Sequence, residues 1–534
     1  MSNNSNYAII DVSKLITVDY INQLSSEKNI EILLSNKRII MKNILVVLLF
    51  ISTIINAQTN RNKVWVQGGA YVFKTDFKTN PFAKTLMNNA TISPKYFTHG
   101  NSNICDSIGN LILLSDGYHI YDTLLNIIDG GDTLVPVELY IDYNGWSLYD
   151  QSTIFLPMDN NQYYLITPTV SDSTHAKWFL PNATDAPFDL LWYNKIDMNA
   201  NAGFGKVVQR KQALLENVRL SKVGMMACRH GNGKDWWLMK PALDTNMIYT
   251  FRVTQDSIYL DTLQGFAEPH FGFWDTKGQT MFNQEGTMYA STYRHSSFIF
   301  LADFDRCYGV LSNPRAIITP IEKTHNPFDS TELDKFNINE GLAFSPNGRF
   351  LYVSSDYNIW QYDLQESDTT LAWHHVAGLD TTWQKFQAYS NMYLGADNKL
   401  YIGNRNGLSQ QMSVIENPDI KGIGCNFCPR CFRFSEIGTG TPPCMPNYSL
   451  GAKVCYPEGL LNPPKEDLNT LEVFPNPSST IFYIKNKKGK KKELYNSVGE
   501  LILSTTKEEI NVSHFSIGIY YLKCENVVKK VVVE

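Results

Sequence analysis

The stretch Phe344–Ser355 reads FSPNGRFLYVSS and decides the fold. It contains a turn around Asn347 and Gly348 and then a run of aromatic and β-branched residues. Asn-Gly pairs adopt the positive φ values of tight turns, and aromatic and β-branched side chains suit half-buried strands. The stretch therefore predicts a tight turn that leads into a β-strand.

The same unit recurs along the middle of the chain. The other copies are CDSIGNLILLS from Cys105, FNQEGTMYAST from Phe282, LGADNKLYIGN from Leu394 and, more weakly, MDNNQYYLITP from Met158 and GNGKDWWLMKP from Gly231. Several of them precede a second aromatic strand, such as FIFLADFD from Phe298. The spacing of about 50 to 70 residues suits a four-stranded propeller blade with loop insertions.

Residues 58–460 are therefore predicted to form a β-propeller with seven blades preferred and six as the alternative. Six copies of the repeat are visible, so the seventh blade needs another source of strands. We expect Lys63–Gln67 to pair with the C-terminal end of the region, because that closure leaves no exposed sheet edge.

Composition limits the class of protein. The chain has 534 residues, of which 43% are hydrophobic and 19% charged, enough for sizeable cores in more than one folded unit. The net charge of −5 argues against a general nucleic-acid binder. The H-E-x-x-H, G-x-S-x-G and P-loop signatures are missing from the sequence. We therefore assign no catalytic residue, metal ligand or cofactor.

Residues 41–57, MKNILVVLLFISTIINA, have the three parts of a secretory signal peptide. Lys42 supplies the positive charge, and the apolar run Ile44–Ile55 is shorter than the roughly 20 residues of a membrane-spanning helix. We expect cleavage between Ala57 and Gln58. Residues 1–40 are interpreted as a spurious extension, with Met41 as the initiator.

At the other end of the chain, residues 461–470 read as a linker and 471–534 as a small β-sandwich. Six short β-rich runs alternate there with turn residues. Pro475 and Pro477 fix φ and cannot donate to a central ladder, so they suit the entry to an edge strand. The lysine-rich stretch Lys487–Lys492 is interpreted as a solvated hairpin turn.

The ordered motifs of this domain resemble the type A sorting domain of the type IX secretion system. The match rests on Pro475-Asn476-Pro477, a segment ending at Gly499, a strand holding Gly518, Tyr520 and Lys523, and a final Lys530–Val533. The resemblance implies export across the outer membrane by the type IX machinery and removal of the domain by its processing protease. It also implies release or attachment to surface lipopolysaccharide.

A second resemblance, over roughly residues 100 to 450, is to the propeller region of large secreted proteins of gliding bacteria. It implies the fold and carries no defined activity, and Pro443–Tyr448 keeps only part of the pattern usual at the end of that region. The matching segments are Tyr193–Met198, Gly203–Val208, Cys228–Trp237, Phe344–Gly348 and Ser413–Pro418.

The most polar cluster surrounds His230, beside Arg229, Asn232 and Asp235. His230 and Asp235 are one candidate site, in the channel of the propeller, with His230 as a ligand or general base. The alternative, which we favour, is a local network in a blade turn, where Asn232 and Asp235 bond nearby backbone groups.

The chain has nine cysteines, and five of them lie close together. Their double C-x-x-C spacing allows a zinc site with Cys444 as the fourth thiolate. An exported protein meets an oxidising compartment, so we favour disulfides. Five cysteines cannot all pair with one another, so one must be free or reach Cys105, Cys228, Cys307 or Cys524. The candidates are Cys425, Cys428, Cys431, Cys444 and Cys455.

The sequence thus predicts a secreted or cell-surface binding protein without catalytic activity, acting on an unknown extracellular ligand and not on nucleic acid. Two alternatives stay open: a hydrolase or lactonase-like enzyme that uses the propeller channel with bound calcium, and a structural part of a surface assembly.

Overall fold

The computed structural model describes the chain from residue 60 onward and divides it into two compact units between Val454 and Cys455. Residues 1–40, the signal peptide 41–57 and the linker 461–470 lie outside the described residues. The ranges not described are 1–59, 70, 88–96, 137–148, 180–187, 244, 267–277, 293–297, 321–338, 356, 379–387, 405–408, 437–441, 456–470, 486–488, 497–499 and 525–526.

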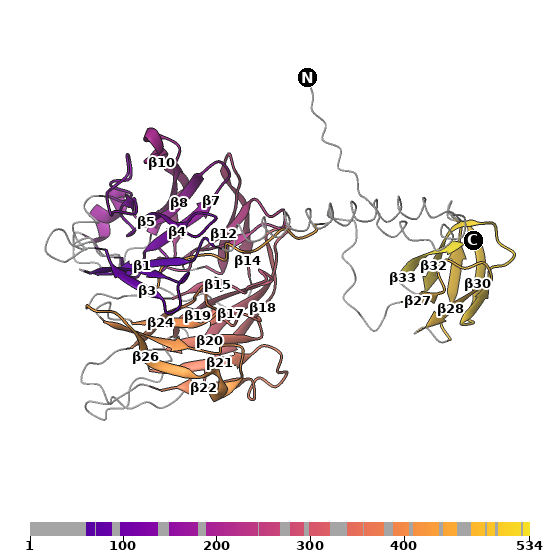
Figure 1. Ribbon diagram of the computed structural model, residues 1–534. Coiled ribbons are helices and arrows are strands. Elements are labelled where there is room, and N and C mark those ends of the chain that lie inside the picture. Colours follow the sequence, from indigo (N-terminus) through magenta and orange to yellow (C-terminus); the bar gives the residue numbers. More distant parts are fainter. Residues whose placement is uncertain are drawn as a thin grey trace, which may run out of the picture. The chain divides into compact units, whose positions relative to one another are not determined.

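The described residues of the larger unit form seven antiparallel sheets, one after another in chain order from indigo β1 to orange β26 (Figure 1). We call them blades 1 to 7.

Blade 1 comprises β1 (Val64–Gly68), β2 (Val72–Asp76) and β3 (Ala83–Leu86), and blade 2 comprises β4 (Ser102–Cys105), β5 (Leu111–Ser115) and β6 (Ile120–Tyr121). Blade 3 comprises β7 (Ile154–Pro157), β8 (Gln162–Thr169), β9 (Phe188–Asp197) and β10 (Lys206–Leu220). Blade 4 comprises β11 (Met226–Arg229), β12 (Trp236–Pro241), β13 (Met247–Val253) and β14 (Ile258–Gly265).

Blade 5 comprises β15 (Thr280–Phe282), β16 (Met288–Thr292), β17 (Phe298–Asp305) and β18 (Val310–Ile318). Blade 6 comprises β19 (Asn339–Phe344), β20 (Phe350–Ser355), β21 (Ile359–Asp363) and β22 (Trp373–Ala377). Blade 7 comprises β23 (Tyr389–Leu394), β24 (Leu400–Asn404), β25 (Gln411–Ile415) and β26 (Phe427–Arg433).

Each copy of the sequence repeat forms the turn between the first two strands of a blade, in blades 2 to 7. Local side-chain hydrogen bonds hold these turns: Asn232 Oδ1 accepts from two main-chain N–H groups at 2.9 and 3.0 Å, and Asn283 Oδ1 does so at 2.7 and 3.0 Å. Asn398 and Gly348 take the positive φ values, 64° and 72°, that the turn requires. Turn chemistry therefore explains why the repeat is visible in the sequence.

The sheets close into a ring, because blade 7 packs against blade 1. Trp65 of β1 lies edge-on to Tyr401 of β24 with ring centroids 5.2 Å apart, and Phe73 lies 4.8 Å from Phe434. The first strands of blades 4 to 7 are almost wholly buried, whereas the last strand of blade 4 is mostly exposed. The prediction of an all-β propeller is confirmed, with seven sheets among the described residues.

The expected closure by strand pairing is wrong. β1 forms a hairpin with β2 in its own sheet, from Val64 opposite Asp76 to Gly68 opposite Val72. The C-terminal part of the unit, from Pro442 to Val454, contains no strand. Its prolines at 442, 443 and 446 lack the N–H groups that a ladder needs.

This C-terminal segment, residues 442–454, instead bonds to four blades in turn. Cys444 N donates to Asn101 O at 2.9 Å, and the Tyr448 hydroxyl donates to Phe155 O at 2.9 Å. Asn447 bonds to Gln284 at 2.9 Å, and Lys453 N donates to Gly231 O at 2.7 Å. Cys444, Met445, Tyr448 and Leu450 belong to the main hydrophobic core.

Helical structure is sparse in the described residues. It consists of α3 (Asp172–Thr174), the π-helical turn η3 (His175–Phe179) and the 3₁₀ turns η4 (Asn201–Gly203) and η5 (Gly422–Cys425). Within the described part of the chain, no helix has the length and apolar character needed to cross a membrane.

The smaller unit is a β-sandwich of two sheets that share one core. The first sheet contains β27 (Glu472–Phe474), β28 (Ile481–Lys485) and β31 (Glu509–Asn511). The second contains β30 (Leu501–Thr505), β29 (Lys492–Tyr495), β32 (Gly518–Cys524) and β33 (Val527–Val533). Buried side chains from both sheets, such as Phe482 and Leu522, pack in one cluster. The six predicted runs are strands here, and β31 is an additional one.

Two details of this unit differ from expectation. The lysine-rich stretch joins β28 to β29, which belong to different sheets, so it is a crossover and not a hairpin turn. A glycine at the start of a strand suggests a close approach of the backbone, but a Cβ atom added at Gly518 would meet nothing nearer than Ser516 O at 4.0 Å.

Candidate functional site

Buried side-chain amides link the first strands of several blades. The amide of Gln279, just before β15, accepts from Met392 N at 2.9 Å and from Leu342 N at 3.1 Å and donates to Met392 O at 2.6 Å. Gln279 is completely buried and links blade 5 to the first strands of blades 6 and 7. A carboxamide carries both a donor and an acceptor. It can therefore make the hydrogen bonds to these strands that a main-chain peptide group would otherwise make.

Two more amides act in the same way. Gln151, just before β7, exchanges two hydrogen bonds of 2.8 Å with the main chain of Thr280, two blades away. Asn103 of β4 accepts from Val66 N at 3.0 Å and donates to Val64 O at 2.8 Å. These amides are therefore structural, since their polar atoms are committed to main-chain partners.

The C-terminal segment contributes to the lining of two cavities. One, of about 230 Å³, is lined by residues of blades 1, 4, 5 and 7 together with Met445 and Asn447. The other, of about 500 Å³, is lined by Arg61, Arg229, Lys234 and Asp159 together with Gly451. We call the second one the arginine cavity; its remaining lining residues are Pro157, Met158, Asn232, Gly233, Asp235, Gln255, Ser449 and Ala452.

Arg229, the last residue of β11, is the most constrained charge of the arginine cavity. Its guanidinium lies 4.0 Å from the centre of the Trp236 ring, and Nη1 donates to Lys234 O at 3.0 Å. Burial, followed by the charges of Arg61 and Arg306, lowers the pKa of Arg229 to about 10. The group therefore stays charged at neutral pH.

The structure places His230 and Asp235 in the turn between β11 and β12. His230 is 5% exposed, accepts from Asn232 N at 2.9 Å and lies 5.1 Å from the Trp237 ring. Burial, with the charge of Arg252, lowers the pKa of His230, so its ring is neutral at pH 7. Asp235 is held by Arg252 at 2.9 Å and by Asn232 at 2.8 Å, and it lines the arginine cavity whereas His230 does not.

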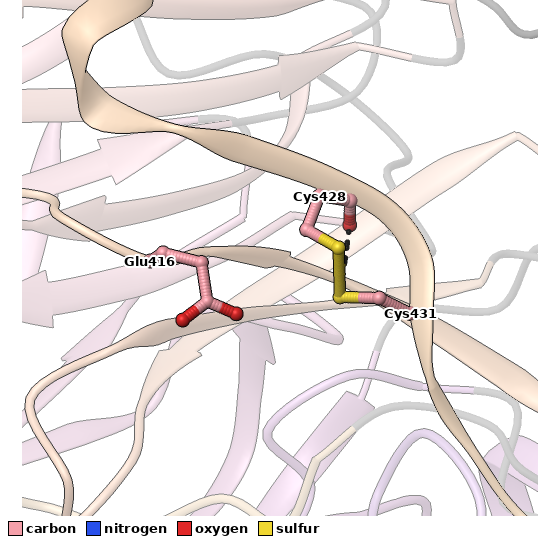
Figure 2. Close-up of side chains that lie close together, drawn as sticks. All are labelled: Glu416, Cys428 and Cys431. Carbon is pink, nitrogen blue, oxygen red and sulfur yellow. Dashed lines mark hydrogen bonds between the residues drawn. A yellow bond between two sulfur atoms is a disulfide. The ribbon is translucent and has the colours of Figure 1, made fainter.

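The cysteine-rich stretch contains one local disulfide, between Cys428 and Cys431 on β26 (Figure 2). Glu416 lies beside it, and these are the three residues whose ligand atoms come within 4.8 Å of one another (Figure 2). Oxidised sulfurs are not thiolate ligands, and the Glu416 carboxylate is paired with Lys399. The group is therefore not a metal centre in this state.

The other candidate cysteines fall into two classes. Cys307 and Cys455 are disulfide-bonded. Cys425 and Cys444 carry free, buried thiols, which differs from the expected disulfides. Each thiol interacts with a tyrosine instead, Cys425 with Tyr352 and Cys444 with Tyr393. Cys105, Cys228 and Cys524 are also free and buried.

In the sandwich, the sorting-motif residues have traceable roles. Asn476 Oδ1 accepts from Val532 N at 2.8 Å and Nδ2 donates to Lys530 O at 3.0 Å, which ties the Pro-Asn-Pro turn to β33. Tyr520 donates from its hydroxyl to Ser516 O at 2.8 Å. Pro475 and Pro477 follow the edge strand β27, Gly518 and Lys523 lie in β32, and Gly499 lies outside the described residues.

Sequence reasoning did not find the buried glutamines, Arg61 or Arg306. Gln151 and Gln279 each precede the first strand of a blade, and that shared position is the one signal that an inspection of the repeats offers. Arg306 follows β17 and meets Arg229 through the packing of blades 4 and 5, whereas Arg61 precedes β1 and lies in a distant part of the sequence.

Residues 472–534 match the family described as the secretion system C-terminal sorting domain. The chain is thus an all-β propeller protein with a type IX sorting domain, and it is a cargo of that system, secreted or attached at the cell surface. A comparison with curated proteins gave no match.

Solved structures offer distant likenesses. The periplasmic gluconolactonase of Pseudomonas aeruginosa is 11% identical over 81% of this chain and 100% of its own, with a TM-score of 0.35. Kluyveromyces lactis Hsv2 is 12% identical over 65% and 86%, with a TM-score of 0.31, and the Dos1 propeller is 11% identical over 62% and 72%, with a TM-score of 0.31. Since these scores are below 0.5, the fold assignment rests on the seven sheets.

Proposed function

We propose that the protein is a non-catalytic binding protein that holds an extracellular ligand at the mouth of its propeller. The observation that carries the proposal is the contrast between buried and accessible polar groups: Gln151, Gln279 and Asn103 are buried and bonded to main-chain groups. The polar atoms of these amides are therefore committed to the fold and are not free to bind a substrate. The arginine cavity, in contrast, is open to solvent and lined by charged groups.

The chemistry near that cavity also favours binding over turnover. General acid-base catalysis needs a titratable group within hydrogen-bond reach of the substrate. His230 is buried against Trp237, and the Asp235 carboxylate is held by Arg252. The other charged groups of the lining are the Arg61 and Arg229 guanidinium groups, the Lys234 ammonium and the exposed Asp159 carboxylate. The two guanidinium groups bind anions and do not exchange protons at neutral pH.

Export determines the partners. The sorting domain engages the type IX secretion machinery. Its processing protease and, for an attached form, surface lipopolysaccharide are further proposed partners, together with the ligand of the mouth. The alternative function, a structural role in a surface assembly, would not require a ligand in the arginine cavity.

The test uses the mature secreted protein. It is incubated with lactone, ester and glycoside substrates and, in parallel, titrated by calorimetry with sugars and sugar acids. We expect saturable binding and no product. Turnover that survives purification and is lost in Asp235→Asn or His230→Gln would establish an enzyme and overturn the proposal.

A further inference from the structure

Three arginines that are far apart in the sequence come together beside the arginine cavity. Arg61 and Arg229 line it, and Arg306 donates from Nε to Arg229 O at 2.8 Å. Arg229 is 4% exposed and Arg306 5% exposed. Like charges repel in a buried setting, so an arrangement that gathers them requires compensation.

The chain itself supplies little of that compensation. Main-chain oxygens of Lys234, Gly451 and Cys105 accept from the three guanidinium groups at 3.0, 2.6 and 3.2 Å. The ion pairs found among the described residues include none of the three. The Nε atom of Arg229 is buried and has no hydrogen-bond partner within the described residues. Buried charge without a counter-ion is costly, so the cluster lacks an anion.

The acidic groups of the cavity do not fill that role. Asp235 is bound by Arg252 at 2.9 Å. The charge of the exposed Asp159 acts on Arg229 from a distance, but Asp159 makes no ion pair with Arg61 or Arg229 among the described residues. Lys234 adds a third positive charge to the lining. The volume of about 500 Å³ is sufficient for a small organic molecule.

We propose that the arginine cavity binds an oxyanion, the carboxylate or phosphate group of a small extracellular molecule, between Arg61 and Arg229. This assignment rests on the proposed binding function and names its ligand class. The planar guanidinium fork fits two oxygens of such a group, and charge-assisted hydrogen bonds are the strongest that a protein offers. Trp236 fixes the plane of the Arg229 guanidinium from behind.

Calorimetry on the secreted protein tests this with glucuronate, inorganic phosphate and glucose. Glucuronate and glucose share a sugar ring, and only glucuronate carries a carboxylate, so this pair tests for carboxylate binding. Inorganic phosphate tests for binding of a phosphate group. We expect at least one anion to bind, glucose not to bind, and the affinity for the anion to fall as sodium chloride is added. Glucose binding as tightly as both anions, or no binding of either anion, would overturn the anion site.

Variants locate the site. Arg61 is half-buried, so Arg61→Gln should fold and weaken the affinity for the anion by about tenfold or more, while Arg61→Lys, which keeps the charge, should weaken it less. Arg315→Gln is the matched control, since Arg315 pairs with Asp303 on β17 at 3.2 Å. Equal affinity in the wild type and Arg61→Gln would contradict the assignment.

The two proposals fail in different ways. Nuclear magnetic resonance of the bound anion after long incubation shows whether it is chemically changed. Conversion would overturn the non-catalytic function and leave the oxyanion site in place. Loss of the anion preference, with binding of a neutral ligand retained, would overturn the oxyanion site and leave the binding function standing.

Discussion

Lys240 of β12 is a single charge in an apolar interior. It is completely buried, and its ammonium donates to Val223 O at 3.1 Å. Burial lowers the pKa of Lys240 from 10.5 to about 7. Between pH 7 and 10.5 the unfolded chain therefore binds a proton that the folded chain does not, so this group makes stability rise with pH in that window.

Lys240→Met is expected to increase the free energy of unfolding at pH 7 and to reduce its rise toward alkaline pH. The lysine accounts for at most about 5 kcal/mol of that rise over the whole window from pH 7 to 10.5. Urea unfolding of both proteins at several pH values between 6 and 9 measures the difference. The control is Lys206→Met, which removes an exposed lysine and should leave the pH dependence of the free energy of unfolding unchanged. The same pH dependence in Lys240→Met as in the wild type would contradict the argument.

The cysteines give a second residue-scale prediction. Burial raises the pKa values of Cys105, Cys228 and Cys444 to about 12, so their thiolates are scarce at neutral pH. Iodoacetamide should label no cysteine of the folded full-length chain, five after unfolding without reductant, and nine after unfolding with reductant. Mass spectrometry counts the labels. Labelling of Cys425 in the folded chain would show that its thiol is accessible to solvent, which contradicts the prediction.

At the scale of elements, the C-terminal segment takes the place of the expected closing strand. Tyr448 anchors the segment in the core. Its ring is fully buried, with its centroid 5.9 Å from that of the Trp236 ring, and its hydroxyl donates to Phe155 O. The polar contacts of the segment reach blades 2 to 5, so the segment ties four consecutive blades to one another.

Tyr448→Phe is expected to destabilise the propeller by about 1 kcal/mol, the value of one hydrogen bond. Tyr448→Ala should cost about 3 to 5 kcal/mol, because it also leaves a cavity. Denaturant unfolding checks both, with Ser449→Ala at the exposed neighbour as the control. Equal stability of the alanine variant and the wild type would mean that the segment does not hold the ring together.

At the scale of the whole molecule, the sorting domain determines the destination. Deletion of residues 472–534 should leave the protein inside the cell envelope, and Asn476→Leu should reduce export because it breaks both bonds to β33. Immunoblots of medium, surface and cell fractions measure this, with Lys507→Ala as the control.

Mass spectrometry of the exported form should begin at Gln58 and lack the sorting domain. Peptides from residues 1–40, or a retained segment after 470, would refute the processing scheme.

The sequence revealed those features whose cause is local. Asn347-Gly348 and the equivalent turn residues encode φ values and side-chain bonds within a few residues, so the repeat and the strands were readable. Asn476 could be singled out within an ordered motif. Gln279 could not, because its partners lie on β19 and β23, more than 60 residues away.

By itself, then, the sequence determined an exported propeller with a sorting sandwich, because turn chemistry, strand composition and motif order are properties of neighbouring residues. The tertiary structure alone decided that the ring closes by packing of blade 7 against blade 1, that residues 442–454 bond to several blades, which cysteines pair, and that Arg61, Arg229 and Arg306 meet beside one cavity. Apart from the Cys428–Cys431 disulfide, those features arise from contacts between segments distant in sequence, which the packing of the blades brings together.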